Sequence, residues 1–261
     1  CLQAGMPTTP PSPPPDSLPA LPAGVESHTI DQLQLRPRIP WDTGLQETWQ
    51  PGEANSLRRL ERFLEASIAE YADTRDLPGQ PGTSCLSPHL HFGEIGPRQI
   101  LYGILSRSKL ELTVKGGSGP AVFVRELGWR EFAHHLLYHF PHTSDQPLDK
   151  RFQHFPWRQG DQVSAHLHAW QRGMTGIPIV DAAMRQLWQT GWMHNRARMI
   201  TASFLVKDLL IDWRWGERWF MQNLLDADLA ANNGGWQWTA GTGTDAAPYF
   251  RIFNPILQSK K

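Results

Sequence analysis

Acidic, basic and aromatic side chains share one predicted helix face between Val124 and Phe132. Glu126, Trp129 and Arg130 are three and four residues apart, which places them on the same side of a helix. An acid, an indole and a guanidinium together could hold a polar, planar ligand. A surface salt bridge beside a core tryptophan explains the same spacing, so both interpretations stay open.

A second polar group opens an apolar segment. Asn195, Arg198 and Met199 share a helix face by the same spacing, and the chain then continues into the apolar run 200–210. Polar side chains at the start of a buried helix need partners, because burying an unpaired polar group is costly. The group is therefore either a binding site or a polar helix cap whose hydrogen bonds are satisfied.

The third stretch runs from Asp226 to Trp238. Two carboxylates, Asp226 and Asp228, precede Asn-Asn-Gly-Gly at 232–235, and this pattern predicts a helix end followed by a turn. Trp236 and Trp238, one residue apart, are expected to point in different directions. A simple helix exit explains the glycine pair but neither the carboxylates nor the two indoles.

A hydroxyl-rich loop, Thr83-Ser-Cys-Leu-Ser87, precedes Pro88. Hydroxyls and free N–H groups at a helix start can bind phosphate, and ordinary helix capping is the alternative. The eleven histidines are scattered without a recognisable ligand set, so no metal site is predicted.

Helices must position these groups. Apolar periodicity predicts helices over 55–72, 97–107, 120–139, 162–172, 177–190, 194–211 and 216–226, and strand-like alternation is nearly absent. Residues 1–40, with eight prolines between Pro7 and Pro22, read as an interdomain linker. The predicted architecture is one all-α domain over 41–261.

Composition narrows the possible functions. The formal net charge is zero, so contact with nucleic acid requires a local basic patch. Cys1 and Cys85 form no disulfide framework, which favours a reduced, cytoplasmic setting, and no signal peptide or membrane-spanning run is visible. The twelve tryptophans indicate either a tryptophan-rich core or stacking and electron-transfer chemistry.

Three longer motifs, 176–185, 190–199 and 230–239, carry a family resemblance. Together they resemble the photolyase/cryptochrome family, and within it the class I cyclobutane pyrimidine dimer photolyases, from about Trp41 to Phe253. The resemblance implies an all-helical domain that binds FAD in a U-shaped form. It also implies that an N-terminal α/β antenna domain and the final helices lie outside this chain.

A cofactor site follows from the resemblance. Arg198 would pair with Asp226 beside the isoalloxazine, Asp228 would bind its pyrimidine edge, and Asn232 would face N5. Phe123 departs from members that carry tryptophan there, so an aromatic face is kept and an N–H is lost. The whole implied set is Tyr71, Thr83, Ser84, Cys85, Leu86, Ser87, Phe123, Arg130, Asn195, Arg198, Asp226, Asp228 and Asn232.

The resemblance also implies a binding site for UV-damaged DNA, single or double stranded. Glu126 and Asn195 would hydrogen-bond a flipped-out dimer, Trp129 and Trp238 would stack on it, and Met199 would line its pocket. The implied DNA contacts are Arg75, Glu126, Trp129, Arg130, Asn195, Arg196, Met199, Trp238 and Gln258.

The implied activity is light-driven. Excited FADH⁻ would donate an electron to the dimer, Glu126 would stabilise the dimer radical anion, and Trp236, Trp213 and Trp157 would relay electrons to the flavin. A folate- or deazaflavin-type antenna is expected on the missing domain, and the protein is expected to be a monomer. The alternatives are a cryptochrome photoreceptor and a helical scaffold that binds DNA without flavin.

Overall fold

The computed structural model describes residues 12–13, 15–20, 22, 24, 26–107, 117–244 and 252–260. Within these ranges the regular elements are all helical, which confirms the predicted all-α class. The described residues before Trp41 form no helix, and the proposed linker boundary at 40 stays a prediction. The α-helices are α1 (Thr43–Thr48), α2 (Glu53–Ala66), α3 (Tyr71–Thr74), α4 (Ser87–His91), α5 (Pro97–Arg107), α6 (Gly119–His139), α7 (Asp161–Gln171), α8 (Pro178–Thr190), α9 (Asn195–Ser203), α10 (Trp213–Asn223), α11 (Leu229–Ala240) and α12 (Pro255–Gln258).

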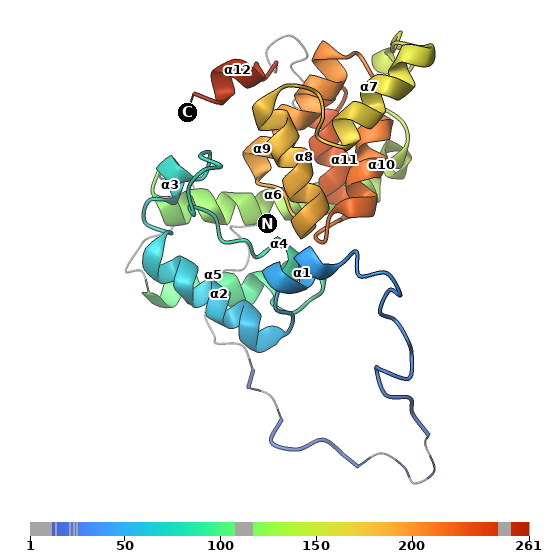
Figure 1. Ribbon diagram of the computed structural model, residues 1–261. Coiled ribbons are helices and arrows are strands. Elements are labelled where there is room, and N and C mark those ends of the chain that lie inside the picture. The colour runs from blue at the N-terminus through green and yellow to red at the C-terminus, as the bar shows by residue number, and fades with distance from the viewer. Residues whose placement is uncertain are drawn as a thin grey trace.

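Two apolar cores lie on either side of the long helix α6 (Figure 1). The first gathers side chains of α2, α5 and the N-terminal half of α6, including Phe63, Ile100 and Val124. The second gathers α7 to α11 around Trp170 and Trp213. Since α6 packs on α3 and α5 and also on α11, it fixes the two halves relative to each other.

The helix predicted over 55–72 is interrupted. α2 ends at Ala66 and α3 begins at Tyr71. A Cβ on Gly119 at the start of α6 would lie 1.9 Å from the Ile68 carbonyl oxygen, so the start of α6 packs closely against the segment between α2 and α3. Periodicity hides the interruption because Tyr71 still enters the same core as α2.

The helix predicted over 194–211 also ends early. α9 stops at Ser203 and continues as a π-helical turn, Phe204–Asp208, after which Leu210 adopts a φ of 56°. α10 then starts at Trp213, three residues before the predicted boundary, where the Asp212 side chain accepts a hydrogen bond from the Arg214 N–H.

The predicted turn at Asn-Asn-Gly-Gly is wrong, because α11 runs straight through residues 232–235. Asp228 begins the helix by accepting a 2.8 Å hydrogen bond from the Ala231 N–H. The C-terminal end of α11 is held by the buried Gln237, whose Nε2 donates to the carbonyls of Thr143 and Gln146. Tertiary packing therefore overrides the weak helix propensity of Asn and Gly.

α10 and α11 meet where the indole of Trp236 lies against Gly216, and a Cβ at Gly216 would lie 2.0 Å from Trp236 Cη2. We expect Gly216→Ala to destabilise the fold by about 1–3 kcal/mol through overpacking. Gly235→Ala, in α11 with no atom near its Cβ position, should instead stabilise by up to about 1 kcal/mol. Urea unfolding of both variants measures the difference, and equal effects would contradict the close contact.

Candidate functional site

The start of α9, the segment between α10 and α11, and α11 itself enclose a cavity of about 190 Å³. Several residues singled out in the sequence meet there. The lining includes Asn195, Arg198, Met199, Asp226, Asp228, Asn232 and Trp236. The second and third polar stretches thus meet at one cavity, whereas no residue of the first stretch, 124–132, lines it.

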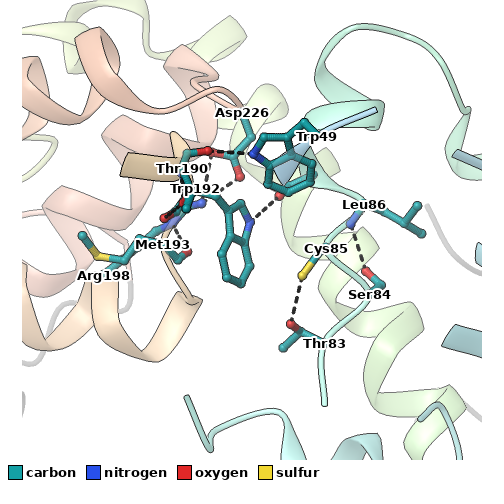
Figure 2. A network of polar contacts seen from close by, with 11 residues as sticks. Trp49, Thr83, Ser84, Cys85, Leu86, Thr190, Trp192, Met193, Arg198 and Asp226 are labelled. Carbon is teal, nitrogen blue, oxygen red and sulfur yellow. Dashed lines mark hydrogen bonds and ion pairs between the residues drawn. The ribbon is translucent and has the colours of Figure 1, made fainter. Parts of the chain in front are cut away.

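Arg198 and Asp226 form the ion pair that the resemblance implies. Nη2 of Arg198 lies 3.0 and 2.7 Å from the two Asp226 oxygens, and its Nε donates to the Met193 carbonyl at 2.8 Å (Figure 2). The Asp226 side chain is only 3% exposed, so its charge depends on this partner. The pair supplies a fixed guanidinium at the cavity wall.

Asn232 is oriented by a residue that the sequence interpretation missed. Its Nδ2 donates to both the backbone oxygen and Oε1 of Glu217, each at 3.0 Å. The amide oxygen is then the atom left to accept a hydrogen bond. Burial raises the pKa of Glu217, which lies on α10, 15 residues away in sequence.

Asp228 is held from two sides. Besides capping α11, its carboxylate lies 3.2 Å from Nε2 of His134 on α6. Asn195, which also lines the cavity, donates to the Met199 sulfur at 3.7 Å. Both carboxylates of the third stretch therefore have defined partners.

The loop 83–87 keeps its hydroxyls off the helix it precedes. No side chain caps α4, so the ordinary-capping interpretation is wrong. The Leu86 N–H donates to Ser84 Oγ at 3.3 Å, Thr83 Oγ1 lies 3.6 Å from Cys85 Sγ, and Cys85 has a φ of 50°. Side chains and backbone of this loop therefore contact one another within the loop.

Two further tryptophans make long-range hydrogen bonds near the cavity, and one of them contacts the loop. Trp192 donates from Nε1 to Ser87 Oγ at 3.3 Å and lies between the loop and the Arg198–Asp226 pair (Figure 2). Trp49 donates to the Thr190 carbonyl at 2.7 Å. Neither was singled out in the sequence, because nothing near them in the chain indicates these long-range partners.

Tyr71 and Phe123 are not brought to this cavity. Both are buried in the first core with ring centroids 5.1 Å apart, and Phe123 also packs on Phe63 at 4.7 Å. Burial, reinforced by the Glu126 charge, raises the pKa of Tyr71 to about 12.

Glu126 pairs with Arg75, and not with Arg130 on its own helix. Arg130 instead lies 3.3 Å from its neighbour Glu131. Trp129 is 56% exposed, so the alternative of a core tryptophan at this position is wrong. An exposed indole beside a paired carboxylate suits contact with a partner or ligand.

The three proposed relay tryptophans lie in or against the second core. Trp236 and Trp213 are buried, and Trp157 is half-buried at its edge. Nε1 of Trp236 has no hydrogen-bond partner among the described residues. Trp238 instead packs near Phe253, with 6.3 Å between the ring centroids. Gln258 is the last residue of α12 and is half-buried.

A second cavity, of about 790 Å³, lies between α8 and α10. Trp188 and Trp219 line it with parallel rings, 8° apart in plane and 6.4 Å between centroids. Arg172 and Arg185 lie at the same cavity. Sequence reasoning missed this site, because the two tryptophans are 31 residues apart.

Metal ligands and membrane spans were searched over the described residues. They contain no group of three or more His, Cys, Asp or Glu placed to hold a metal ion. In the same part of the chain, no helix is long and apolar enough to cross a membrane.

The cavity lies within an all-helical domain, and comparison with known proteins identifies the family of that domain. The family model for the FAD binding domain of DNA photolyase matches residues 123–261. The chain belongs to the photolyase family.

Relatives of known name and structure are similar over most of the chain. The deoxyribodipyrimidine photo-lyase of Escherichia coli is 55% identical over 80% of this chain and 43% of its own length. The crystal structure of a bacterial class III photolyase from Agrobacterium tumefaciens matches with a TM-score of 0.88 and 45% identity, over 99% of this chain and 52% of that one. The crystal structure of an archaeal photolyase from Sulfolobus tokodaii with two FAD molecules matches with a TM-score of 0.68 and 38% identity, over 82% of this chain and 44% of that one. The chain spans about half the length of the curated relatives it matches.

The Arg198–Asp226 pair predicts a large effect on stability. Arg198→Ala leaves the Asp226 carboxylate buried without its partner, and we expect a loss of about 3–5 kcal/mol. Arg151→Ala removes an arginine that is 86% exposed from its pair with Asp149 and should leave the stability nearly unchanged, because solvent screens an exposed pair. Chemical denaturation compares the two variants, and equal losses would contradict a buried, dependent carboxylate.

Proposed function

We propose that this chain is the flavin-bearing, DNA-binding part of a light-driven lyase that splits cyclobutane pyrimidine dimers. The observation that carries the proposal is the cavity where the Arg198–Asp226 pair, Asn232 and Trp236 meet. Photo-lyases among the similar proteins favour repair over the cryptochrome alternative. Asn195 and Met199 favour the cyclobutane dimer, because the (6-4) photolyases resemble this stretch but carry His at both positions.

The cavity fits one end of FAD. Trp236 offers a buried N–H without a partner, Asn232 offers an amide oxygen, and Arg198 offers fixed positive charge. Ligand sites commonly measure about 300–1,000 Å³, so a cavity of about 190 Å³ suits a ring system but not a whole dinucleotide. The remainder of FAD would lie along the Thr83–Ser87 loop, which Trp192 joins to the cavity wall.

FAD bound in its reduced form would supply, on excitation by light, an electron for splitting the dimer, and that electron would be returned afterwards. The chain supplies position and electrostatics. Arg198 favours a reduced, anionic flavin because its charge is already fixed before the ligand arrives. Glu217 orients Asn232, and the Thr83–Ser87 hydroxyls and Asp228 would hold the phosphate and pyrimidine portions.

Damaged DNA would approach the exposed end of this site. Trp129 and Trp238 offer stacking surfaces, and Glu126 and Asn195 offer hydrogen bonds to pyrimidine edges. The strand contacts would come from Arg75, Arg130, Arg196 and Gln258. With zero net charge, these arginines provide the local attraction that DNA binding requires.

We further propose that the antenna chromophore binds on an N-terminal domain outside this chain, and that the cavity lined by Trp188 and Trp219 takes a different planar ligand. The two indole rings are nearly parallel, 8° apart in plane, with centroids 6.4 Å apart, so an exposed indole face could stack on a planar ring. Arg172 and Arg185 suit its anionic substituents.

The relay and stacking roles can be separated in the full-length protein. Trp236→Phe should bind FAD and repair a dimer-containing oligonucleotide when the flavin is chemically reduced first, yet fail to be reduced under blue light. Trp238→Ala should photoreduce normally and bind the dimer more weakly by about 1–3 kcal/mol, the range for one base–aromatic stack.

Flavin absorbance under illumination and dimer affinity are measured for each variant. Photoreduction of Trp236→Phe at the wild-type rate would return that indole to a packing role. Absence of light-dependent dimer repair by the reduced wild-type protein would overturn the proposed function.

The second cavity predicts ligand binding independent of the flavin. Folic acid, a planar ring with carboxylates, should quench tryptophan fluorescence on titration, and Trp188→Ala should weaken its binding by about 1–3 kcal/mol. Trp215→Ala is the matched control, since this indole is 48% exposed on α10 and lies outside the cavity lining. Equal affinity in the two variants would contradict stacking on Trp188.

A further inference from the structure

One carboxylate joins two arginines at the edge of the proposed DNA site. Asp76 Oδ2 contacts Nη2 of Arg196, and Asp76 Oδ1 lies 3.7 Å from Nε of Arg75. Arg75 in turn contacts Glu126 through Nη1. Positive and negative side chains therefore alternate along a row from α6, past the end of α3, to α9.

Aromatic rings fix the two guanidiniums further. Arg75 lies over the Tyr71 ring at 5.6 Å, and Arg196 lies over the Phe253 ring at 5.7 Å. Both arginine side chains are 21% exposed, whereas Asp76 is 43% exposed. The arginines thus have little freedom, and the charge most accessible to solvent between them is negative.

Two guanidiniums that share one carboxylate repel each other strongly once that carboxylate is removed. Asp76 therefore does two things at once. It holds Arg75 and Arg196 side by side, and it lowers the positive potential that any DNA backbone would meet there.

We propose that Asp76 is a positioning residue that determines specificity for damaged DNA. The inference rests on the proposed function. Undamaged duplex gains only from phosphate contacts, and the Asp76 charge opposes these. A flipped dimer gains in addition from Glu126, which Arg75 holds in place, so Asp76 penalises the two kinds of DNA unequally.

Removing the Asp76 charge should strengthen the binding of undamaged DNA, whereas a purely structural disturbance would weaken it. Asp76→Asn removes the negative charge and keeps the side-chain shape. Undamaged DNA should bind about fivefold more tightly, as expected for one charge at a binding-site rim. The looser arrangement of Arg75 and Glu126 should give no matching gain for the lesion, so the preference for damaged DNA should fall by about the same factor.

The experiment measures affinities for matched oligonucleotides with and without a thymine dimer, using full-length protein loaded with FAD. Asp73→Asn is the matched control: Asp73 is exposed on α3, three residues before Asp76, and the structure gives it no ion pair among the described residues. The expected result is a lower lesion preference in Asp76→Asn and an unchanged preference in Asp73→Asn.

An unchanged preference in Asp76→Asn, or the same change in both variants, overturns the role of Asp76. Weaker binding of both DNAs by Asp76→Asn also overturns it, since that result indicates a purely structural role. A wild-type protein without lesion preference would instead contradict the proposed function itself.

Discussion

The geometry of the site depends on the ion pair between Arg198 and Asp226. One partner comes from α9 and the other from the segment before α11, so the pair sets the distance between the two walls of the cavity. A neighbouring backbone hydrogen bond, from the Leu225 N–H to the Gly191 carbonyl, joins the segment before α11 to the end of α8 at 2.7 Å. Because an isolated carboxylate in this position would be costly, the wall is fixed before any ligand binds.

Helix α6 extends that constraint across the molecule. Its N-terminal half carries Phe123 into the first core, while His134 near its other end reaches Asp228 at the start of α11. Glu126 lies between these points and contacts Arg75 beyond the end of α3. The groups proposed to meet flavin and DNA thus belong to two cores that share one rigid helix.

Helical periodicity could be predicted from the sequence, and it placed α5 to α8 within about a residue of their ends and grouped Asn195, Arg198 and Met199 correctly. What it could not supply were partners distant in the chain. Glu217 beside Asn232 and the parallel Trp188–Trp219 pair depend on how α8, α10 and α11 pack. The prediction of a turn at Asn-Asn-Gly-Gly was wrong for the same reason. The local propensity of these residues opposes the helix that packing with neighbouring elements forms there.

That composition has a dynamic consequence. α11 carries two asparagines and two glycines in its interior and is poorly suited to exist as an isolated helix. It persists because α6, α9 and α10 surround it, so its backbone amides are protected from solvent exchange only while those neighbours stay assembled. The helix that forms one side of the cavity is therefore part of the cooperative unit of the second core, and opening the cavity by unwinding this side requires the whole unit to loosen.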